Sequence, residues 1–179
     1  MAGTRQKKIY DQTTVMQQLD TVIAGMDEDR RQKYLEWLDV QADYLVRELK
    51  FDSKRLLNYE RRDLILLNFG FNVGSELGGM HWGVVVEHKN RKGSNTIVVV
   101  PLSSLDDEET EESLHSSEVY LGVIQGINDR KVKACVGQIK AISKVRLYKP
   151  KNKHQNRIRI STDQMDKIDE KVKQLFRIK

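Results

Sequence analysis

The sequence predicts an α+β fold in which a small β-barrel with a C-terminal helix follows an N-terminal extension of two helices. Three observations predict it. Apolar residues recur at helical spacing in residues 1–60, short β-branched runs separated by polar turns follow, and helical spacing returns at the end. Many short strands closed by a terminal helix are typical of a small barrel and not of a doubly wound sheet. We therefore expect two domains, residues 1–60 and 61–179.

The extension should contain two helices of unequal length. A first apolar stripe begins at Val15 and keeps the spacing of one helix face, and a second stripe runs from Tyr34 to Leu49. Gly25 and Asp27 are suited to end one helix and begin the next. Because isolated amphipathic helices of this length are only marginally stable, we expect these stripes to pack on the barrel, to pair in a dimer or to receive a partner.

The barrel should consist of short strands followed by one helix. Ser161 and Gln164 have the spacing of a capping box, and an apolar stripe from Met165 to Phe176 predicts the helix that follows. The β-branched and alternating runs predict strands at residues 64–69, 83–86, 96–102, 119–124, 131–136, 145–148 and 157–160.

Composition limits the class of protein. The chain of 179 residues is 39% hydrophobic and 32% charged, which allows a modest core under a well-hydrated surface. It has neither an apolar run long enough to span a membrane nor an N-terminal secretory pattern, so we expect a cytoplasmic protein with no membrane partner. The single cysteine, Cys135, excludes an intrachain disulfide and should be a core residue in a strand. Since no spacing of His, Cys, Asp and Glu is typical of a metal site, no metal or other cofactor is expected.

Positive charge is concentrated in the C-terminal half, from Asp129 onward, although the net charge is only +5. A basic surface favours a polyanionic partner such as nucleic acid, and a hydrated surface that keeps the protein soluble is the alternative. The acidic run at residues 106–112 opposes the trend and should be an exposed loop. The basic residues that lie close together in the sequence are Lys149, Lys151, Lys153, Arg157 and Arg159.

The most informative segments are a glycine-rich polar loop and the two buried strands that follow it. The loop and first strand read Asn72-Val-Gly-Ser-Glu-Leu-Gly-Gly-Met-His-Trp-Gly-Val-Val-Val-Glu87, and the second strand includes Val98-Val-Val-Pro-Leu-Ser103. A third segment reads Gly137-Gln-Ile-Lys-Ala-Ile-Ser-Lys-Val-Arg-Leu147. In their order and spacing these segments, within residues 61–177, resemble the PemK/MazF toxins of toxin–antitoxin systems. The helical extension is atypical of that family.

The resemblance implies an SH3-like (CcdB/Kid-type) barrel that forms a homodimer and cuts single-stranded RNA without a metal. In such toxins the ribose 2′-hydroxyl attacks the adjacent phosphate, which gives a cyclic phosphate and a free 5′-hydroxyl end. This reaction needs a proton acceptor, a proton donor, and positive charge or hydrogen bonds on the phosphorane oxygens. The resemblance also implies an antitoxin as a protein partner.

His81 and Ser103 are the candidate catalytic residues. The family usually has an arginine, a permanent charge for phosphate, where this chain has His81, which can exchange a proton near neutral pH. We expect His81 to transfer a proton or bind a phosphate, and a hydrogen bond within the barrel mouth is the alternative. Ser103 matches the family's threonine or serine and is expected to donate a hydrogen bond to a phosphate oxygen, unless it only caps a turn.

A second group of residues is expected to bind the substrate. Trp82 could stack on an unpaired base, although packing in the core is the alternative favoured for a tryptophan beside a valine-rich strand. Gln138 and Lys140 match the family's glutamine and arginine and would supply positioning and charge. The full set of expected substrate-binding residues is Ser75, Glu76, Gly78, Gly79, Trp82, Gln138, Lys140 and Arg146.

Two departures from the family pattern leave another function open. His81 replaces the arginine, and Gly137 replaces a frequent glutamate. The alternative is a catalytically inactive barrel that binds nucleic acid or a protein partner; DNA gyrase, the partner of a related toxin family, has no specific residue in its support. The run at 106–112 or the helix at 27–50 could also cover an RNA groove, although a solvated loop and a structural helix are the simpler interpretation.

Overall fold

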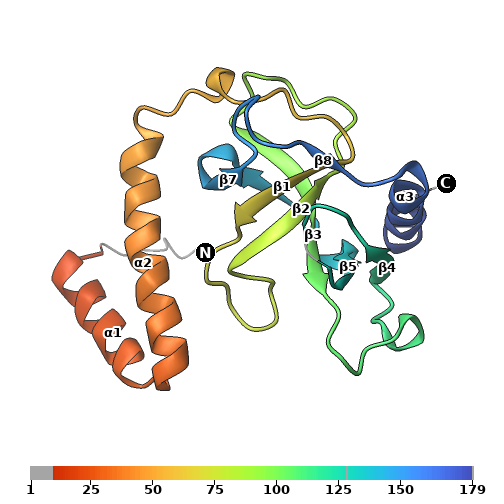
Figure 1. The fold of residues 1–179 in the computed structure, drawn as a ribbon. Helices are drawn as coiled ribbons and strands as arrows, with labels where there is room; N and C mark the ends of the chain where they lie inside the picture. The colour runs from red at the N-terminus through yellow and green to blue at the C-terminus, as the bar shows by residue number, and fades with distance from the viewer. Residues whose placement is uncertain (1–9, 128, 179) are drawn as a thin grey trace, which may run out of the picture. The chain divides into compact units, whose positions relative to one another are not determined.

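The computed structural model describes residues 10–127 and 129–178 and divides into two compact units, Met1–Ala42 and Asp43–Lys179 (Figure 1). Helix α1 (Gln12–Ala24) lies in the first unit, and helix α2 (Glu28–Glu48) runs across the boundary. The predicted pair of helices is therefore confirmed. The domain boundary expected at residue 60 stays a prediction.

The corner between the two helices has a clear local cause. Helix α1 ends where the backbone N–H of Gly25 donates to Thr21 O at 3.2 Å and the N–H of Met26 donates to Ile23 O at 3.1 Å. The side chain of Asp27 then accepts from the N–H of Arg30 at 2.9 Å and opens α2, as an N-terminal cap does. Among the described residues, no helix combines the length and hydrophobicity needed to cross a bilayer.

The second unit is built on one antiparallel sheet of eight strands in the order β4-β5-β3-β2-β1-β7, with β6 paired to β3 and β8 paired to β1. Within the described ranges, β4 and β7 remain the two ends of this hydrogen-bonded path, so backbone pairing does not close the barrel completely. The strands are β1 (Asp63–Asn68), β2 (Met80–Val85), β3 (Thr96–Ser104), β4 (Glu118–Val123), β5 (Lys131–Cys135), β6 (Lys140–Ser143), β7 (Leu147–Lys149) and β8 (Ile158–Arg159).

The α+β class, the antiparallel sheet and the C-terminal helix α3 (Thr162–Phe176) are confirmed. The expectations missed β6, because its four residues include one buried side chain, Ile142, and show no clear alternation. The strand predicted at 145–148 is also shifted, since a 3₁₀ turn at Lys144–Arg146 delays β7 to Leu147.

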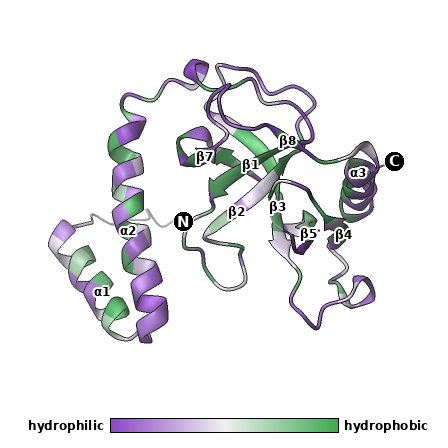
Figure 2. Ribbon diagram, in the orientation of Figure 1, coloured by the Kyte–Doolittle hydropathy of each residue, from purple (hydrophilic) through white to green (hydrophobic). Residues whose placement is uncertain are grey.

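Strand alternation divides the core into two clusters. Leu64, Val84 and Val100 lie in the first cluster, and their sequence neighbours Ile65, Val85 and Val99 lie in the second. Helix α3 covers the first cluster with Met165 and Ile168. Figure 2 shows hydrophobic colour on β1 and mostly polar colour on α3. Each sheet face therefore has apolar contacts, which fixes the strand register.

The predicted capping box of α3 is confirmed. Ser161 Oγ accepts from the N–H of Gln164 at 3.1 Å, and Gln164 Oε1 accepts from the N–H of Ser161 at 2.8 Å. Gln164 Nε2 also donates to the carbonyl oxygen of Leu121 at 2.7 Å, which ties the first turn of the helix to β4.

Candidate functional site

The loop at residues 72–79 and one face of the sheet enclose a cleft of about 510 Å³. We call it the His81 cleft. It brings together five of the residues expected to act in function, namely Ser75, Gly78, His81, Ser103 and Gln138, and adds six that were not expected: Leu77, His115, Ser117, Glu118, Lys133 and Cys135.

Three polar side chains form a row across three strands of this cleft. Strands β2 and β3 are antiparallel and pair Gly83 with Pro101. Two residues further along the same register, His81 lies level with Ser103. Strands β3 and β5 pair Ser103 directly with Lys133. Side chains at the same level of neighbouring strands project to the same face of a sheet. We call His81, Ser103 and Lys133 the polar row.

His81 is held in one orientation by its neighbours. Its Nδ1 lies 3.0 Å from the carbonyl oxygen of Leu102, and the ring meets Phe69 edge-on with centroids 6.4 Å apart. A carbonyl oxygen can only accept, so Nδ1 carries the proton of the neutral ring and Nε2 has the unprotonated lone pair. The hydrogen bond in the barrel mouth and the capacity to accept a proton are therefore both present, on different nitrogens.

Gln138 fixes the 72–79 loop beside the cleft. Its Oε1 accepts from the N–H of Leu77 at 3.3 Å, and its Nε2 donates to the carbonyl oxygen of Ser75 at 3.2 Å. Asn72 supports the same loop from within by donating to Phe69 O at 3.2 Å and to Leu77 O at 2.6 Å. The structure thus gives Gln138 a positioning role toward the loop; contact with a substrate stays a prediction.

The two adjacent glycines of the loop have a structural reason. A Cβ atom at Gly78 would lie 2.5 Å from the carbonyl oxygen of Gly70, which no side chain tolerates. Gly79 has φ +78°, a backbone angle that favours glycine, and its N–H donates to Gly70 O at 2.7 Å. Close approach of RNA to these glycines stays a prediction, and Glu76 is exposed on the same loop outside the cleft lining.

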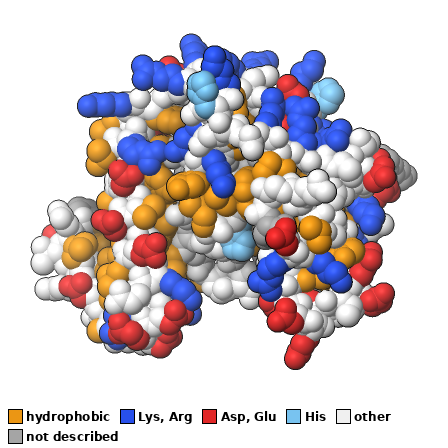
Figure 3. All heavy atoms as spheres, viewed as in Figure 1, with side chains coloured by type: hydrophobic (Ala, Val, Ile, Leu, Met, Phe, Trp, Pro, Cys, Tyr) orange, Lys and Arg blue, Asp and Glu red, His pale blue; other side chains and the backbone are white. Residues whose placement is uncertain are grey.

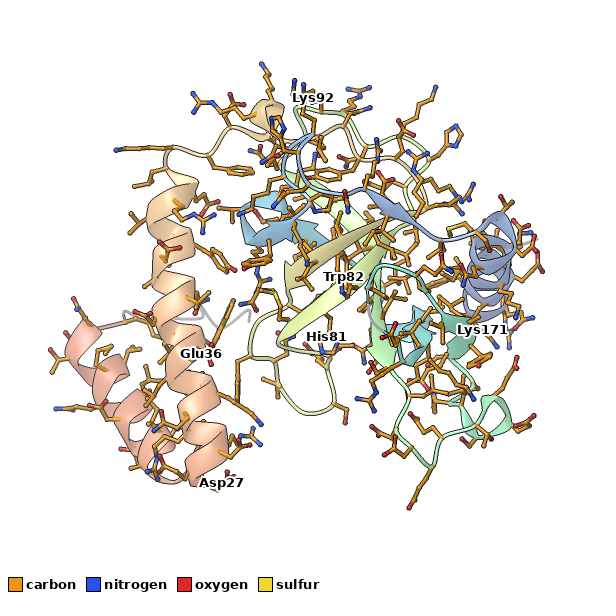
Figure 4. All side chains as sticks on the ribbon, in the orientation of Figure 1. Asp27, Glu36, His81, Trp82, Lys92 and Lys171 are labelled. Atoms are coloured by element: carbon orange, nitrogen blue, oxygen red, sulfur yellow. The ribbon has the colours of Figure 1, made fainter. Side chains whose placement is uncertain are left out.

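Trp82 projects to the opposite face of β2 from His81, as alternation requires, and Figure 4 labels both residues, with Trp82 above His81. It packs against the first core cluster, and Lys149 Nζ lies 5.2 Å from its ring centroid. It also borders a smaller hollow of about 380 Å³, together with His81 and Ser103, at the end of β3. Packing, the alternative favoured from the sequence, accounts for most of its surroundings.

Two expected cations lie outside the lining of the His81 cleft, beside Phe69. Lys140 Nζ lies 6.0 Å from the Phe69 ring centroid, and Arg146 Nη2 donates to Phe69 O at 3.3 Å. Burial lowers the pKa of the Arg146 guanidinium, with the nearby Tyr44 acting in the opposite direction. Their binding to a substrate stays a prediction, and the structure shows them supporting the residue on which His81 rests.

The sequence did not identify Lys133 as a site residue, although it occupies the cleft. Its Nζ lies 2.5 Å from Glu109 Oε1 and 3.3 Å from Glu118 Oε2. Burial alone would lower the pKa of Lys133, but the hydrogen bonds that its ammonium group donates to the two glutamates outweigh burial and raise the pKa. Alternation in β5 could have placed Lys133 on a polar face, but only the strand pairing places it opposite Ser103.

His115 is a second histidine that lines the cleft. It is exposed, and its Nδ1 lies 2.8 Å from Ser117 Oγ. Cys135, by contrast, is the core strand residue that was expected. Burial first, with the neighbouring Glu118 second, raises the pKa of its thiol to about 11, so it stays protonated at neutral pH.

Part of the basic C-terminal run has a structural partner. Arg157 Nε and Arg159 Nε donate to Oδ1 of the buried Asp63 at 2.8 and 2.7 Å, and both arginines also pair with Glu60. Figure 3 shows further Lys and Arg side chains over the β2–β3 and β7–β8 loops, at the top of the view. The clustering of basic residues in the sequence therefore reflects, for these two arginines, the neutralisation of a buried carboxylate.

Comparison with solved structures finds MazF from Deinococcus radiodurans, at 14% identity and TM-score 0.48, over 68% of this chain and 99% of that chain. Mycobacterium tuberculosis toxin MazF-mt6 aligns at 12% identity and TM-score 0.47, over 66% and 99%. MazE–MazF from D. radiodurans aligns at 15% identity and TM-score 0.46, over 69% and 99%. A comparison with curated protein sequences finds no match.

The family comparison covers most of the sheet-bearing unit. Residues 60–176 match the model of the PemK-like, MazF-like toxin of type II toxin–antitoxin systems, and the two N-terminal helices lie outside the match. This is more than half of the chain and agrees with the segments from which the resemblance was inferred. The chain belongs to the PemK-like, MazF-like toxin family.

Proposed function

We propose that this protein is an endoribonuclease that cuts single-stranded RNA without a metal, by attack of the ribose 2′-hydroxyl on the adjacent phosphate. Membership of a family whose proteins are typically endoribonucleases supports the reaction class. The observation that carries the proposal is the fixed His81 ring, whose Nε2 lone pair shares a cleft with the Ser103 hydroxyl.

His81 Nε2 takes the proton of the 2′-hydroxyl as the 2′-oxygen forms its bond to phosphorus. The bond from phosphorus to the 5′-oxygen breaks, and that oxygen takes a proton from a water molecule, whose hydroxide then receives the proton held by His81 Nε2. The products are a 2′,3′-cyclic phosphate and a 5′-hydroxyl end, so atoms and charge balance. Ser103 donates a hydrogen bond to a phosphorane oxygen, which stabilises the charge that develops there.

The partners follow from the same proposal. Single-stranded RNA is the substrate, and the type II toxin–antitoxin family supports an antitoxin protein as the partner that restrains the enzyme. A homodimer and the expected domain boundary at residue 60 remain part of the proposal.

Cleavage of a long single-stranded RNA in EDTA tests the proposal, with wild type, His81→Ala and a matched control, His154→Ala. His154 lies in an exposed loop outside the cleft lining. Wild type and the control should give fragments with 5′-hydroxyl ends, which a polynucleotide kinase labels without prior phosphatase treatment. His81→Ala should be slower by about 10²- to 10⁴-fold, the usual contribution of a general base.

The second candidate function is a barrel that binds nucleic acid or protein without cutting. The observations in its favour are the two departures from the family pattern, His81 in place of an arginine and Gly137 in place of a glutamate. Absence of cutting by wild type, with the 106–112 run intact or deleted, would establish this candidate over the enzyme. Cuts that persist in His81→Ala would keep the enzyme and assign its chemistry to other residues.

A further inference from the structure

The acidic run at residues 106–112 is attached to the polar row through one carboxylate. Glu109 Oε1 contacts Lys133 Nζ at 2.5 Å, and Lys133 is the strand partner of Ser103. We propose that Lys133 is a phosphate-binding residue of the His81 cleft. Glu109 occupies the ammonium group of Lys133 and so competes with the RNA phosphate from within the protein. The identity of the ligand as RNA rests on the proposed function.

Lys133 is suited to hold a phosphate. Among the described residues that line the cleft it is the one lysine or arginine, and it shares the face of His81 and Ser103. Its side chain is only 14% exposed, so a charge there is less screened than one on the open surface. An ammonium group binds a phosphate oxygen through the same charge-assisted hydrogen bond that it makes with a carboxylate.

Glu109 is held in place by the loop that carries it. Its second oxygen accepts from the N–H of Asp106 at 2.9 Å, which sets the direction of the carboxylate. The base of the loop is joined to the start of β5, because Leu105 N–H donates to Lys131 O at 2.9 Å and Arg130 Nη2 donates to Leu105 O at 3.2 Å. The contact with Lys133 is therefore a built arrangement and not a chance approach of a loose side chain.

The local charge makes this competition effective. Lys133 faces two carboxylates, Glu109 and Glu118, so the three side chains together carry one net negative charge. A phosphate that enters the cleft meets this charge until Glu109 moves away. With Glu109 removed, Lys133 and Glu118 would sum to zero, and Lys133 would have an N–H donor available for the phosphate.

Binding of a single-stranded RNA with 2′-O-methyl riboses, followed by fluorescence anisotropy, tests the proposal. This probe lacks the attacking hydroxyl and cannot be cut by the proposed reaction. Binding can therefore be measured whether or not the protein is a nuclease. The variants are Glu109→Gln, Lys133→Gln, their combination, and Glu108→Gln as the matched control. Glu108 has the same charge in the same run but is exposed, whereas Glu109 is partly buried against Lys133.

Glu109→Gln should lower the Kd by about three- to tenfold, as expected for loss of a partly exposed ion pair that competes with the ligand. Glu108→Gln should change it by less than about twofold, because only the diffuse loop charge changes. Lys133→Gln should weaken binding, and the combined variant should lose the gain of Glu109→Gln.

The proposal is overturned if Glu109→Gln and Glu108→Gln bind alike, if neither binds detectably, or if the combined variant keeps the gain. Should Lys133→Gln fail to fold, as thermal unfolding would reveal, the comparison of Glu109→Gln with Glu108→Gln still decides. Cleavage of unmodified RNA, measured separately, tells whether the proposed enzyme activity stands.

Discussion

Nδ1 of His81 lies 3.0 Å from the carbonyl oxygen of Leu102, one residue before Ser103 on the neighbouring strand. The contact joins the two candidate catalytic residues into one unit, because the atom that orients the histidine belongs to the strand that carries the serine. A shift of β3 would therefore disturb both residues together.

Replacing His81 with asparagine should separate its two tasks. An asparagine amide can donate to Leu102 O in place of Nδ1–H, so the free energy of unfolding should stay within about 1 kcal/mol of wild type. It has no group equivalent to the Nε2 lone pair, so RNA cleavage should still fall by about 10²-fold or more. Urea unfolding and cleavage rates check this. If His81→Asn cut RNA at the wild-type rate, proton transfer at His81 would have no part in the mechanism.

Loss of Gln138 should loosen the 72–79 loop without unfolding the sheet. Gln138→Ala removes the acceptor of the Leu77 N–H and the donor to Ser75 O, so amide exchange in this loop should accelerate. Hydrogen exchange followed by mass spectrometry measures the effect, with Gln125→Ala, in the exposed β4–β5 turn, as control. Cleavage should slow by about tenfold because Ser75 loses its position. Equal exchange in both variants would contradict the bracing role.

The buried Asp63 should be a principal electrostatic support of the barrel. Asp63→Ala removes the acceptor shared by Arg157 and Arg159 and that of the Glu60 N–H. Removing one partner of such a pair costs about 3 kcal/mol of unfolding free energy. Urea unfolding measures the loss, and Asp129→Ala, an exposed aspartate, should change stability by less than about 0.5 kcal/mol.

The buried Lys144 should cost stability at neutral pH. Burial lowers its pKa below the ordinary value of 10.5, with the nearby Glu87 acting in the opposite direction. Between the lowered pKa and 10.5 the folded state binds fewer protons than the unfolded state. The cost of burying the charge therefore shrinks, and the free energy of unfolding increases, as the pH rises through that window.

Lys144→Met, which keeps the volume and removes the charge, should be equal to wild type or more stable by about 1 kcal/mol at pH 7. The difference between the two proteins should shrink as the pH is raised toward 10, and denaturant unfolding at several pH values measures it. A variant that is less stable than wild type by a constant amount would show that the contacts of Lys144 with Arg91 O and the Tyr59 ring outweigh its burial.

Local signals in the sequence predicted local structure well. The capping box of Ser161 and Gln164 and the helix corner at Gly25 depend on residues a few positions apart, and both form as expected. The resemblance led to His81, Ser103 and Gln138, which the fold brings to one cleft.

The parts that the sequence did not reveal depend on long-range pairing. Lys133 becomes a neighbour of Ser103 only because β5 pairs with β3. The two residues are thirty positions apart in the sequence. The charge run of Arg157 and Arg159 indicated a polyanionic partner, but the buried partner Asp63 lies near the start of the barrel. Neither the Lys133–Ser103 pairing nor the contact of the two arginines with Asp63 can be read from residues that are close in the sequence.

The central position of β3, which pairs with β2, β5 and β6, has a consequence for synthesis on the ribosome. The polar row exists only after β5 has emerged and joined β3, and a one-residue slip of β3 would turn Ser103 to the opposite face. A truncated or misregistered chain would therefore lack an assembled cleft. The cleft is therefore complete only late in synthesis, after the greater part of the chain has left the ribosome.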